Sequence, residues 1–481
     1  MNYKIIIKIL GRILFLEGLL LIIPLIVSLV YKENTYLSFL IPIIFLLILG
    51  GSLSMVKTDN KNFYAKEGFV VVGLSWVLMS IFGAFPFFIS QEIPSYADAL
   101  FETVSGFTTT GATVLSNVEG LSKGMNFWRC FTHWIGGMGV LVFILAILPS
   151  SEGQNIHLLK AESTGPQVGK LVSKVRFTAR ILYLIYFALT LIEVVLLLFG
   201  GRNLYDSICT SFATAGTGGF GIYNDSVASF NLYCQIVIGV FMLIFGVNFN
   251  IYYLLLIGKV KQALKSEELR WYLGIVTFSI VSITINLVLA LDYSIGSAIS
   301  HSFFQVSSII TTTGFSSCDF NLWPSFSKFI LFILMFVGAC AGSTGGGIKV
   351  SRIVILAKSL KREINRLIHP NIVSHIKFEG ETVDENVVKG VNSYFAVLMF
   401  LFVTTFVLIS FDGMDLATNI TAAAACINNI GPGLTTIVGP MGNFSSFSVF
   451  SKIVLSLSML IGRLEIYPIL ILFIPKVWSK R

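Results

Sequence analysis

Long apolar stretches recur along the chain and are separated by short polar segments. Ten of them approach or exceed the 20 or so helical residues that cross a bilayer core of about 30 Å. They cover residues 13–30, 37–55, 68–90, 126–149, 181–199, 231–257, 271–291, 327–357, 391–411 and 447–475. This pattern predicts an all-α membrane protein, and an even number of spans puts both termini on one side. No small-x-small cleavage site follows the first stretch, so we expect an uncleaved span.

The composition fits a chain embedded in lipid. Of 481 residues, 55% are hydrophobic and 12% are charged, and the 42 Phe and 42 Gly suit lipid contact and close helix packing. A soluble domain carries about twice this charged fraction. The composition therefore excludes a soluble enzyme, a disordered chain and a secreted disulfide scaffold. The six cysteines lack Cys-x-x-Cys spacing, which predicts free thiols and no metal cluster.

The basic residues predict which side faces the cytoplasm. The net charge is +8, and 26 of the 33 Lys and Arg lie at the termini or in loops on the same side. Because cytoplasmic loops carry an excess of Lys and Arg, both termini are predicted to be cytoplasmic, and no nucleic-acid partner is needed to explain the charge. The alternate loops hold six basic residues: Lys32, Lys123, Arg129, Arg202, Lys328 and Lys452.

The predicted external side is acidic. Eleven acidic residues against six basic ones give it a net charge of −5, which would concentrate cations near the entrance. Ordinary polar loops would give a similar pattern, so the charge supports cation traffic without establishing it. The acidic residues are Glu33, Glu92, Asp98, Glu102, Glu119, Asp206, Asp225, Asp292, Asp319, Asp412 and Asp415.

Four segments on this side share one layout. Each holds a helix too short to span, predicted at 96–108, 204–213, 295–311 and 414–428, followed by small residues around a glycine and then the next span. The glycines are 105, 98 and 117 residues apart, so four copies of one unit are predicted around a pseudo-fourfold axis. We expect two added helices at 1–66 and repeats at 67–150, 151–260, 261–365 and 366–481. The glycine-containing segments read Thr109-Thr110-Gly111-Ala112-Thr113, Thr214-Ala215-Gly216-Thr217, Thr312-Thr313-Gly314-Phe315 and Asn429-Ile430-Gly431-Pro432.

The backbone carbonyls of such segments are suited to binding a cation. Non-helical backbone at membrane depth is tolerated only where it is buried in protein or lines a water-filled path. Four segments around one axis would surround that path with carbonyl oxygens, which replace the hydration shell of a cation. Glycine gives the backbone the freedom to turn successive carbonyls the same way.

The eighth stretch contains a predicted break. Residues 338–347 include five glycines in ten, which disfavours a continuous helix and predicts an unwound loop below the short helices. Arg463 lies sixteen residues into the tenth stretch, where a charge is costly and usually functional. It could hold the carbonyls of this loop as a gate, or it could form a structural pair with Glu465 or Glu193. The gate candidates are Gly338, Gly342, Gly345, Gly346, Gly347, Lys349 and Arg463.

Five motifs together resemble the TrkH/KtrB/HKT superfamily of potassium transporters. They are FTTTGATVL at 107–115, ITTTGF at 310–315, NIGPG at 429–433, GSTGGGIK at 342–349 and GRLE at 462–465. The likeness runs across nearly the whole chain, and the two stretches before residue 57 resemble the added pair of the TrkH branch. The second segment departs from the family pattern, because Ala213-Thr214-Ala215 replaces a run of threonines.

The resemblance implies potassium uptake across the bacterial inner membrane and a loop that acts as a gate. Family members with serine at the first filter glycine tend to pass sodium, so Gly111, Gly216, Gly314 and Gly431 imply a preference for potassium. It also implies a homodimer that is regulated by a cytoplasmic nucleotide-binding ring of the TrkA type. The basic loops at 150–180 and 358–389 could dock this partner, or could serve only to orient the chain.

Other interpretations are weaker. A sodium-selective pore of the same fold and an ion-coupled solute symporter are the alternatives, although symporters usually show inverted repeats and half-helix N-termini that face an anion. The segment GTGGFG at 216–221 matches G-x-G-x-x-G but lacks the strand and helix of a dinucleotide site. His133, beside Trp134, is predicted to be a packed, hydrogen-bonded residue. We expect no enzyme, no cofactor, and potassium as the substrate.

Overall fold

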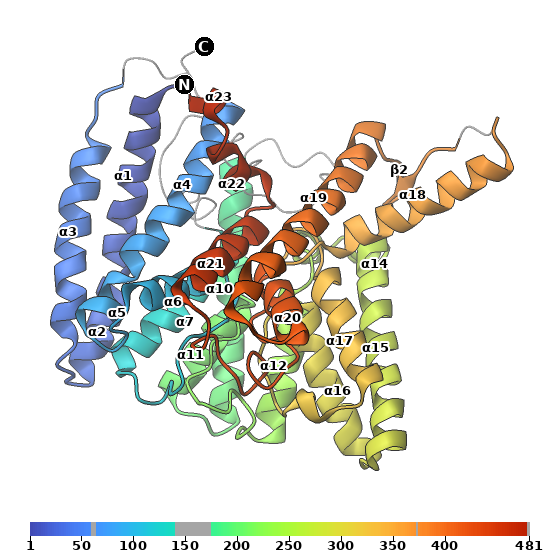
Figure 1. Ribbon diagram of the computed structural model, residues 1–481, viewed down its shortest axis with the longest axis horizontal. Coiled ribbons are helices and arrows are strands. Elements are labelled where there is room, and N and C mark those ends of the chain that lie inside the picture. Colours follow the sequence, from blue (N-terminus) through green and yellow to red (C-terminus); the bar gives the residue numbers. More distant parts are fainter. Residues whose placement is uncertain (59–63, 140–174, 372–373, 479–481) are drawn as a thin grey trace.

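The computed structural model describes residues 1–58, 64–139, 175–371 and 374–478 (Figure 1). Nearly all of its regular structure is helical, and the two short strands form an antiparallel hairpin in which Lys377 pairs with Thr382. The elements are α1 (Tyr3–Leu20), α2 (Ile22–Val30), α3 (Tyr36–Ser54), α4 (Ala65–Gly83), α5 (Phe85–Ile89), α6 (Tyr96–Phe107), α7 (Lys123–Gly137), α10 (Val175–Phe199), α11 (Leu204–Ala215), α12 (Leu232–Phe245), α13 (Phe249–Leu256), α14 (Val260–Leu264), α15 (Glu267–Leu291), α16 (Ile295–Ile310), η1 (Phe320–Leu322), α17 (Ser325–Val337), α18 (Val350–Ile368), β1 (Lys377–Phe378), β2 (Glu381–Thr382), α19 (Glu385–Ile409), η2 (Ser410–Asp412), α20 (Leu416–Ile427), α21 (Val449–Arg463), α22 (Tyr467–Leu472) and α23 (Pro475–Trp478).

Six of the predicted spans are helices that are long and apolar enough to cross a membrane. Within the described residues they cover Tyr3–Val30, Tyr36–Ser54, Ala65–Ile89, Ala179–Phe199, Glu267–Leu291 and Glu385–Asp412. The first begins ten residues before the predicted 13–30, so its basic residues lie inside the helix. The fourth predicted span, 126–149, is described only as far as residue 139, and the rest of it and most of the basic loop 150–180 lie outside the described residues.

Three other predicted spans are broken. The break between α17 and α18 was expected from the glycines, whereas continuous helices over 231–257 and 447–475 were wrong. The chain bends by 90° between α12 and α13, where the side chain of Asn248 accepts a hydrogen bond from the backbone N–H of Asn250 and caps α13. The chain also breaks after Arg463, where Glu465 and Ile466 adopt left-handed backbone with φ of 55° and 71°.

The helices form four units of span, short helix and span. Each short helix packs against the span before it, in the pairs α4·α6, α10·α11, α15·α16 and α19·α20, and against the helix after it, in the pairs α6·α7, α11·α12, α16·α17 and α20·α21. Neighbouring units also pack in a closed cycle through α7·α11, α12·α16, α17·α20 and α21·α6. The predicted boundaries of the repeats stay predictions, and the boundary at 150/151 lies outside the described residues.

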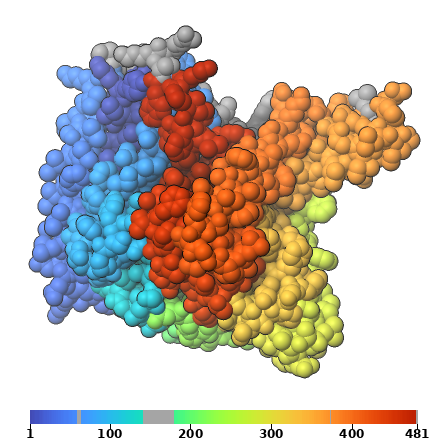
Figure 2. All heavy atoms as spheres, in the orientation of Figure 1, coloured from blue at the N-terminus to red at the C-terminus, as the bar shows by residue number. Residues whose placement is uncertain are grey.

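Two features extend beyond this ring. The N-terminal helices α1 and α3 pack together on one flank, and α18 projects from the opposite flank (Figures 1 and 2). The start of α1 and the last described helix, α23, lie on the same side of the molecule (Figure 1). Many large apolar side chains of α3, α10 and α15 are exposed, among them Phe199 and Phe278, which suits contact with membrane lipid.

Close packing of α1 on α3 generates a prediction about two neighbouring glycines. An added Cβ at Gly50 would overlap the backbone nitrogen of Phe15, whereas one at Gly51 would meet only Phe15 Cδ2, at 3.9 Å. Alanine raises helix propensity at both positions by about 1 kcal/mol. We expect Gly50→Ala to destabilise the protein by about 1–3 kcal/mol through overpacking, and Gly51→Ala to have no such effect. Thermal unfolding in detergent compares the two, and equal midpoints would contradict the packing.

Candidate ion pathway

The four short helices α6, α11, α16 and α20 begin in the same way. The side chains of Ser95, Asn203, Ser294 and Asp415 each accept a hydrogen bond from the backbone N–H three residues later. Such caps satisfy one of the free N–H groups at a helix start and fix the point where the chain turns into the helix. The register of each short helix is therefore set at its N-terminus, and its C-terminus carries the loop that follows.

The same turn follows all four helices. The backbone N–H of Thr110, Gly218, Thr313 and Ile430 each donates to the carbonyl five residues earlier, at 2.8 or 2.9 Å. The residue before each of them has left-handed backbone, namely Thr109, Thr217, Thr312 and Asn429, with φ between 52° and 58°. The glycine after each of them, namely Gly111, Gly219, Gly314 and Gly431, also has positive φ, between 77° and 98°.

The second repeat departs from the predicted register. Thr214 and Ala215 belong to α11, and Gly216 caps that helix with an ordinary φ of −69°. The residues equivalent to Thr109, Thr110 and Gly111 are Thr217, Gly218 and Gly219, three positions later than predicted. The prediction failed because Ala213 to Ala215 continue the helix, so the first glycine after it ends the helix instead of forming the loop.

The four glycines close a ring. An added Cβ at Gly111 would overlap the carbonyl oxygen of Gly218, one at Gly219 that of Thr313, and one at Gly314 that of Ile430. At Gly431 it would lie 2.7 Å from the carbonyl oxygen of Thr110, which returns to the first repeat. Each repeat therefore presents a carbonyl beside the glycine of the next, and side chains at the glycine positions would not fit.

These four carbonyls are buried and accept no hydrogen bond from any described residue. Thr110, Gly218, Thr313 and Ile430 are all buried, yet none of their carbonyl oxygens has a donor in the described part of the chain. Buried carbonyls without partners are rare, because an unpaired one has lost its contact with water. All four repeats contribute residues near Gly111, Gly219, Gly314 and Gly431 to one open depression, which also includes Arg129 and Tyr223.

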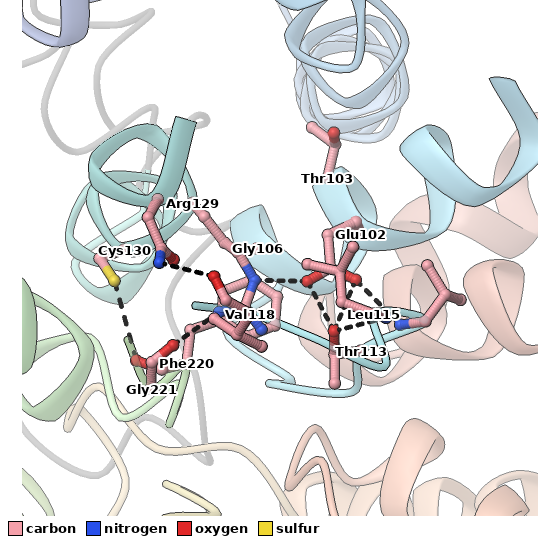
Figure 3. A network of polar contacts seen from close by, with 12 residues as sticks. Glu102, Thr103, Gly106, Thr113, Leu115, Val118, Arg129, Cys130, Phe220 and Gly221 are labelled. Carbon is pink, nitrogen blue, oxygen red and sulfur yellow. Dashed lines mark hydrogen bonds and ion pairs between the residues drawn. The ribbon is translucent and has the colours of Figure 1, made fainter. Parts of the chain in front are cut away.

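A buried ion pair lies behind the first and second loops (Figure 3). Glu102 of α6 and Arg129 of α7 are among the charges predicted on the external side, but they lie in helices and not in exposed loops, and their side chains are 0% and 2% exposed and lie 2.5 Å apart. His133 of α7 is buried and hydrogen-bonded, as predicted, and it connects α6 to the second loop. Its Nδ1 lies 2.8 Å from the carbonyl oxygen of Gly106, and its Nε2 accepts from the N–H of Phe220 at 3.2 Å.

The glycine-rich loop between α17 and α18 fills the break between α12 and α13. The N–H of Cys340 donates to the carbonyl of Gly246, and the N–H of Phe249 donates to the carbonyl of Gly342, both at 3.0 Å. The loop thus forms hydrogen bonds with a carbonyl at the end of α12 and an N–H at the start of α13, which have no partner within their own helices. Gly338, Gly342, Gly347 and Lys349 all have positive φ, between 69° and 83°.

The loop lies directly against the third and fourth turns. The N–H of Gly346 donates to Thr312 Oγ1 at 2.6 Å, and an added Cβ at Gly345 would lie 2.9 Å from the carbonyl oxygen of Thr311. The ammonium of Lys349, which is buried, donates to the carbonyl of Gly345 within the loop. Position 345 therefore requires glycine, because the backbone of the loop lies close to the backbone of the third turn.

Arg463 joins this loop to the first repeat. Its guanidinium donates to the carbonyl of Thr344 at 2.7 Å and to the carbonyls of Gly136 and Gly137 at 2.5 and 2.8 Å. Glu465, one of the two acids considered as its partner, forms an ion pair with Arg352 at the start of α18. The structure thus brings Arg463 to one carbonyl of the loop, that of Thr344, and its role in a gate stays a prediction.

Comparison with known proteins identifies the family of this chain. A TrkH family profile described as "Cation transport protein" matches residues 37–480. The chain belongs to the TrkH family. The Trk system potassium uptake proteins TrkH of Escherichia coli K12 and of Vibrio parahaemolyticus are 36% and 35% identical, over 100% and 99% of this chain and 100% of each relative. The crystal structure of the potassium transporter TrkH from V. parahaemolyticus matches with a TM-score of 0.89 and 33% identity, over 100% of both chains.

Two features of this region were not predicted from the sequence. The register of the second loop was legible in Thr217-Gly218-Gly219, which repeats the Thr-x-Gly pattern of Thr109 to Gly111 and Thr312 to Gly314. The second feature is Glu268 of α15, whose Oε1 accepts from the N–H of Ala341 at 2.7 Å and of Ser351 at 3.2 Å, and so ties both ends of the glycine-rich loop. No local pattern signals that contact, since it joins residues far apart in sequence.

The corrected register predicts different effects for two glycines of the second loop. Gly219→Ala places a Cβ against the carbonyl of Thr313 and forces a left-handed alanine, whereas Gly221→Ala meets nothing closer than 3.3 Å. A left-handed alanine costs about 1–2 kcal/mol, equivalent to about 5- to 30-fold in a rate. We expect Gly219→Ala to lower cation uptake by about tenfold, and Gly221→Ala to change it less than about twofold. Tracer uptake per amount of folded protein measures both, and equal uptake would refute the register.

Proposed function

We propose that this chain takes up potassium across the bacterial inner membrane through one central filter. The filter would consist of the carbonyls of Thr109 to Gly111, Thr217 to Gly219, Thr312 to Gly314 and Asn429 to Gly431. The observation that carries this proposal is the ring of buried carbonyls at Thr110, Gly218, Thr313 and Ile430, to which no described residue donates a hydrogen bond. The relatives named as potassium uptake proteins support the choice of ion.

The chemistry follows from the ends of the four short helices. A dehydrated cation needs several oxygen ligands to replace its water, and carbonyls supply them without a net charge that would bind it too tightly. The C-terminal end of each helix carries partial negative charge, which favours a cation in the space beneath the filter. A symporter site would instead present helix N-termini to an anion. The orientation of α6, α11, α16 and α20 favours the cation pore over that alternative.

The glycines favour potassium over sodium. With glycine at all four positions, each segment approaches its neighbour through backbone alone. A serine at one of them would push the adjacent carbonyl away and change the coordination. The sodium-selective alternative is therefore less favoured and is one outcome of the experiment below.

The glycine-rich loop would act as the gate. It contacts the third and fourth turns, and Arg463 ties it to the first repeat. A guanidinium in this position also repels a cation that has passed the filter. Opening requires that Arg463 release Thr344 or Gly136 and Gly137.

Assembly is proposed on the family resemblance. Two copies of the chain would form a homodimer in which each has its own pore, and a cytoplasmic nucleotide-binding ring of the TrkA type would control the gate. The basic segment 358–389 supports docking of such a ring, because α18 extends beyond the body of the molecule (Figure 2). The termini would be cytoplasmic.

Complementation tests the proposed transport. The chain, with its regulatory partner, should restore growth at low external potassium to a bacterium that lacks potassium uptake. Gly111→Ser should reduce rescue and shift uptake from potassium toward sodium by about tenfold, because the new side chain overlaps the carbonyl of Gly218. A wild-type chain that is well expressed and gives no rescue would refute the proposal, and rescue only with sodium would favour the sodium pore.

Removal of Arg463 tests the gate. We expect Arg463→Ala to raise ion flux without the regulatory partner by about tenfold, because three hydrogen bonds that hold the loop are lost. Lys361→Ala is the matched control, since Lys361 is exposed on α18 and takes no part in the loop. Flux into liposomes measures both. Unchanged flux through a correctly inserted Arg463→Ala protein would contradict the proposed gate.

A further inference from the structure

The Glu102–Arg129 pair contacts both filter loops of the first two repeats. Glu102 accepts hydrogen bonds from Thr113 Oγ1 at 2.9 and 3.0 Å and from the N–H of Val114 at 3.0 Å, both just after Gly111 (Figure 3). Arg129 donates to the carbonyl of Gly221, just after Gly219, at 2.8 Å. The pair therefore spans the boundary between two repeats.

The surroundings of the pair fix both side chains. The Arg129 guanidinium lies 3.6 Å from the centre of the Phe220 ring, which is buried, while its Nε contacts Glu102. Within the described part of the chain, the hydrogen-bond partners of these two side chains are each other, Thr113, Val114 and the carbonyl of Gly221. A buried ion pair of this kind is no more stable than a well-packed apolar pair, so stability alone does not account for it. Its geometric effect is specific, because it holds Thr113, Val114 and Gly221 at set positions.

The other repeats lack this charge. Glu102 lies nine residues before its filter glycine, and the corresponding residues are Thr210, Gln305 and Ala422. Gln305 makes a neutral version of the contact, since its Nε2 donates to Ser317 Oγ at 3.4 Å within its own repeat. At this position the described repeats carry a charge only in the first, and another ion pair between repeats, Asp98–Lys452 at 2.6 Å, joins the start of α6 to α21 and does not contact a filter loop.

From these contacts we propose that Glu102 and Arg129 are positioning residues that determine ion selectivity. They hold the filter segments of the first and second repeats at a fixed separation, which sets the distance between the carbonyls of Thr110 and Gly218. A looser separation admits ions of other sizes without closing the pathway. This inference rests on the proposed filter, and it adds the residues that keep the filter in shape.

Three variants weaken the bridge by different amounts. Thr113→Val removes the hydroxyl donor but leaves the ion pair, so it keeps the buried charges matched. Glu102→Asp keeps the charge and shortens the side chain, and Arg129→Lys keeps the charge and loses the planar set of donors. Thr103→Val is the control, because Thr103 is the buried neighbour of Glu102 on α6 and bonds only within that helix, to the carbonyl of Ala99.

The readout is the ratio of potassium to sodium uptake in liposomes, per amount of folded protein. We expect the ratio to fall by about threefold in Thr113→Val and by about tenfold in Glu102→Asp and Arg129→Lys, with potassium uptake retained. Thr103→Val should keep the wild-type ratio. The double variant Glu102→Asp/Arg129→Lys should lose no more than either single variant, because both act through one contact.

An unchanged ratio in Thr113→Val and in whichever charged variants fold would overturn the inference. So would an equal fall in potassium and sodium uptake, which indicates a structural role alone. Failure of the proposed function is distinct from both, since the wild-type protein would then show no potassium uptake in the same liposomes.

Discussion

The structure depends on one constraint: backbone polar groups inside a membrane protein must find partners without water. Each short helix ends in a left-handed turn that uses its own last carbonyls, and the glycine-rich loop pairs with the broken ends of α12 and α13. Arg463 accounts for the carbonyls of Gly136, Gly137 and Thr344. The carbonyls of Thr110, Gly218, Thr313 and Ile430 have no donor among the described residues, and in the proposed filter a cation would be their partner.

The same constraint explains why glycine is placed where it is. Filter segments from neighbouring repeats touch through backbone, and a Cβ at Gly111, Gly219 or Gly314 would occupy the space of a carbonyl oxygen. Gly345 and Gly346 likewise let the glycine-rich loop lie against the third and fourth turns, where an added Cβ would also be too close to a backbone carbonyl. Glycine thus serves two layers at once, since the filter and the loop are in contact through Thr312 Oγ1 and the N–H of Gly346. Movement of the loop would therefore change contacts of the proposed filter.

The sequence predicted the units of the fold because they rest on local signals. Apolar length gave most spans, and helix-compatible pieces followed by small residues around a glycine gave the four short helices to within two residues at each end. The error in the second filter came from the same method, since Ala213 to Gly216 resemble a loop locally and only the contact of Gly219 with Thr313 sets the register. The dismissed nucleotide-like segment at 216–221 is in fact that loop. The contact between Glu102 and Arg129 was not predicted either, because it joins the short helix 96–108 to the next predicted span and no local pattern signals that the two charges meet.

A direction for gating follows from the connections of the loop. Its start and end are both tied to α15 through Glu268, and its end continues into α18, which is anchored by the Arg352–Glu465 ion pair to the break after α21. That break holds Ile466, a β-branched residue with φ of 71°, in a conformation that costs free energy and relaxes if the helix is rearranged. Arg463 lies at the same break. In the proposed gate, a displacement of α18 would reach Glu465 through this ion pair, and Arg463 through the adjoining turn, without passing through the proposed filter.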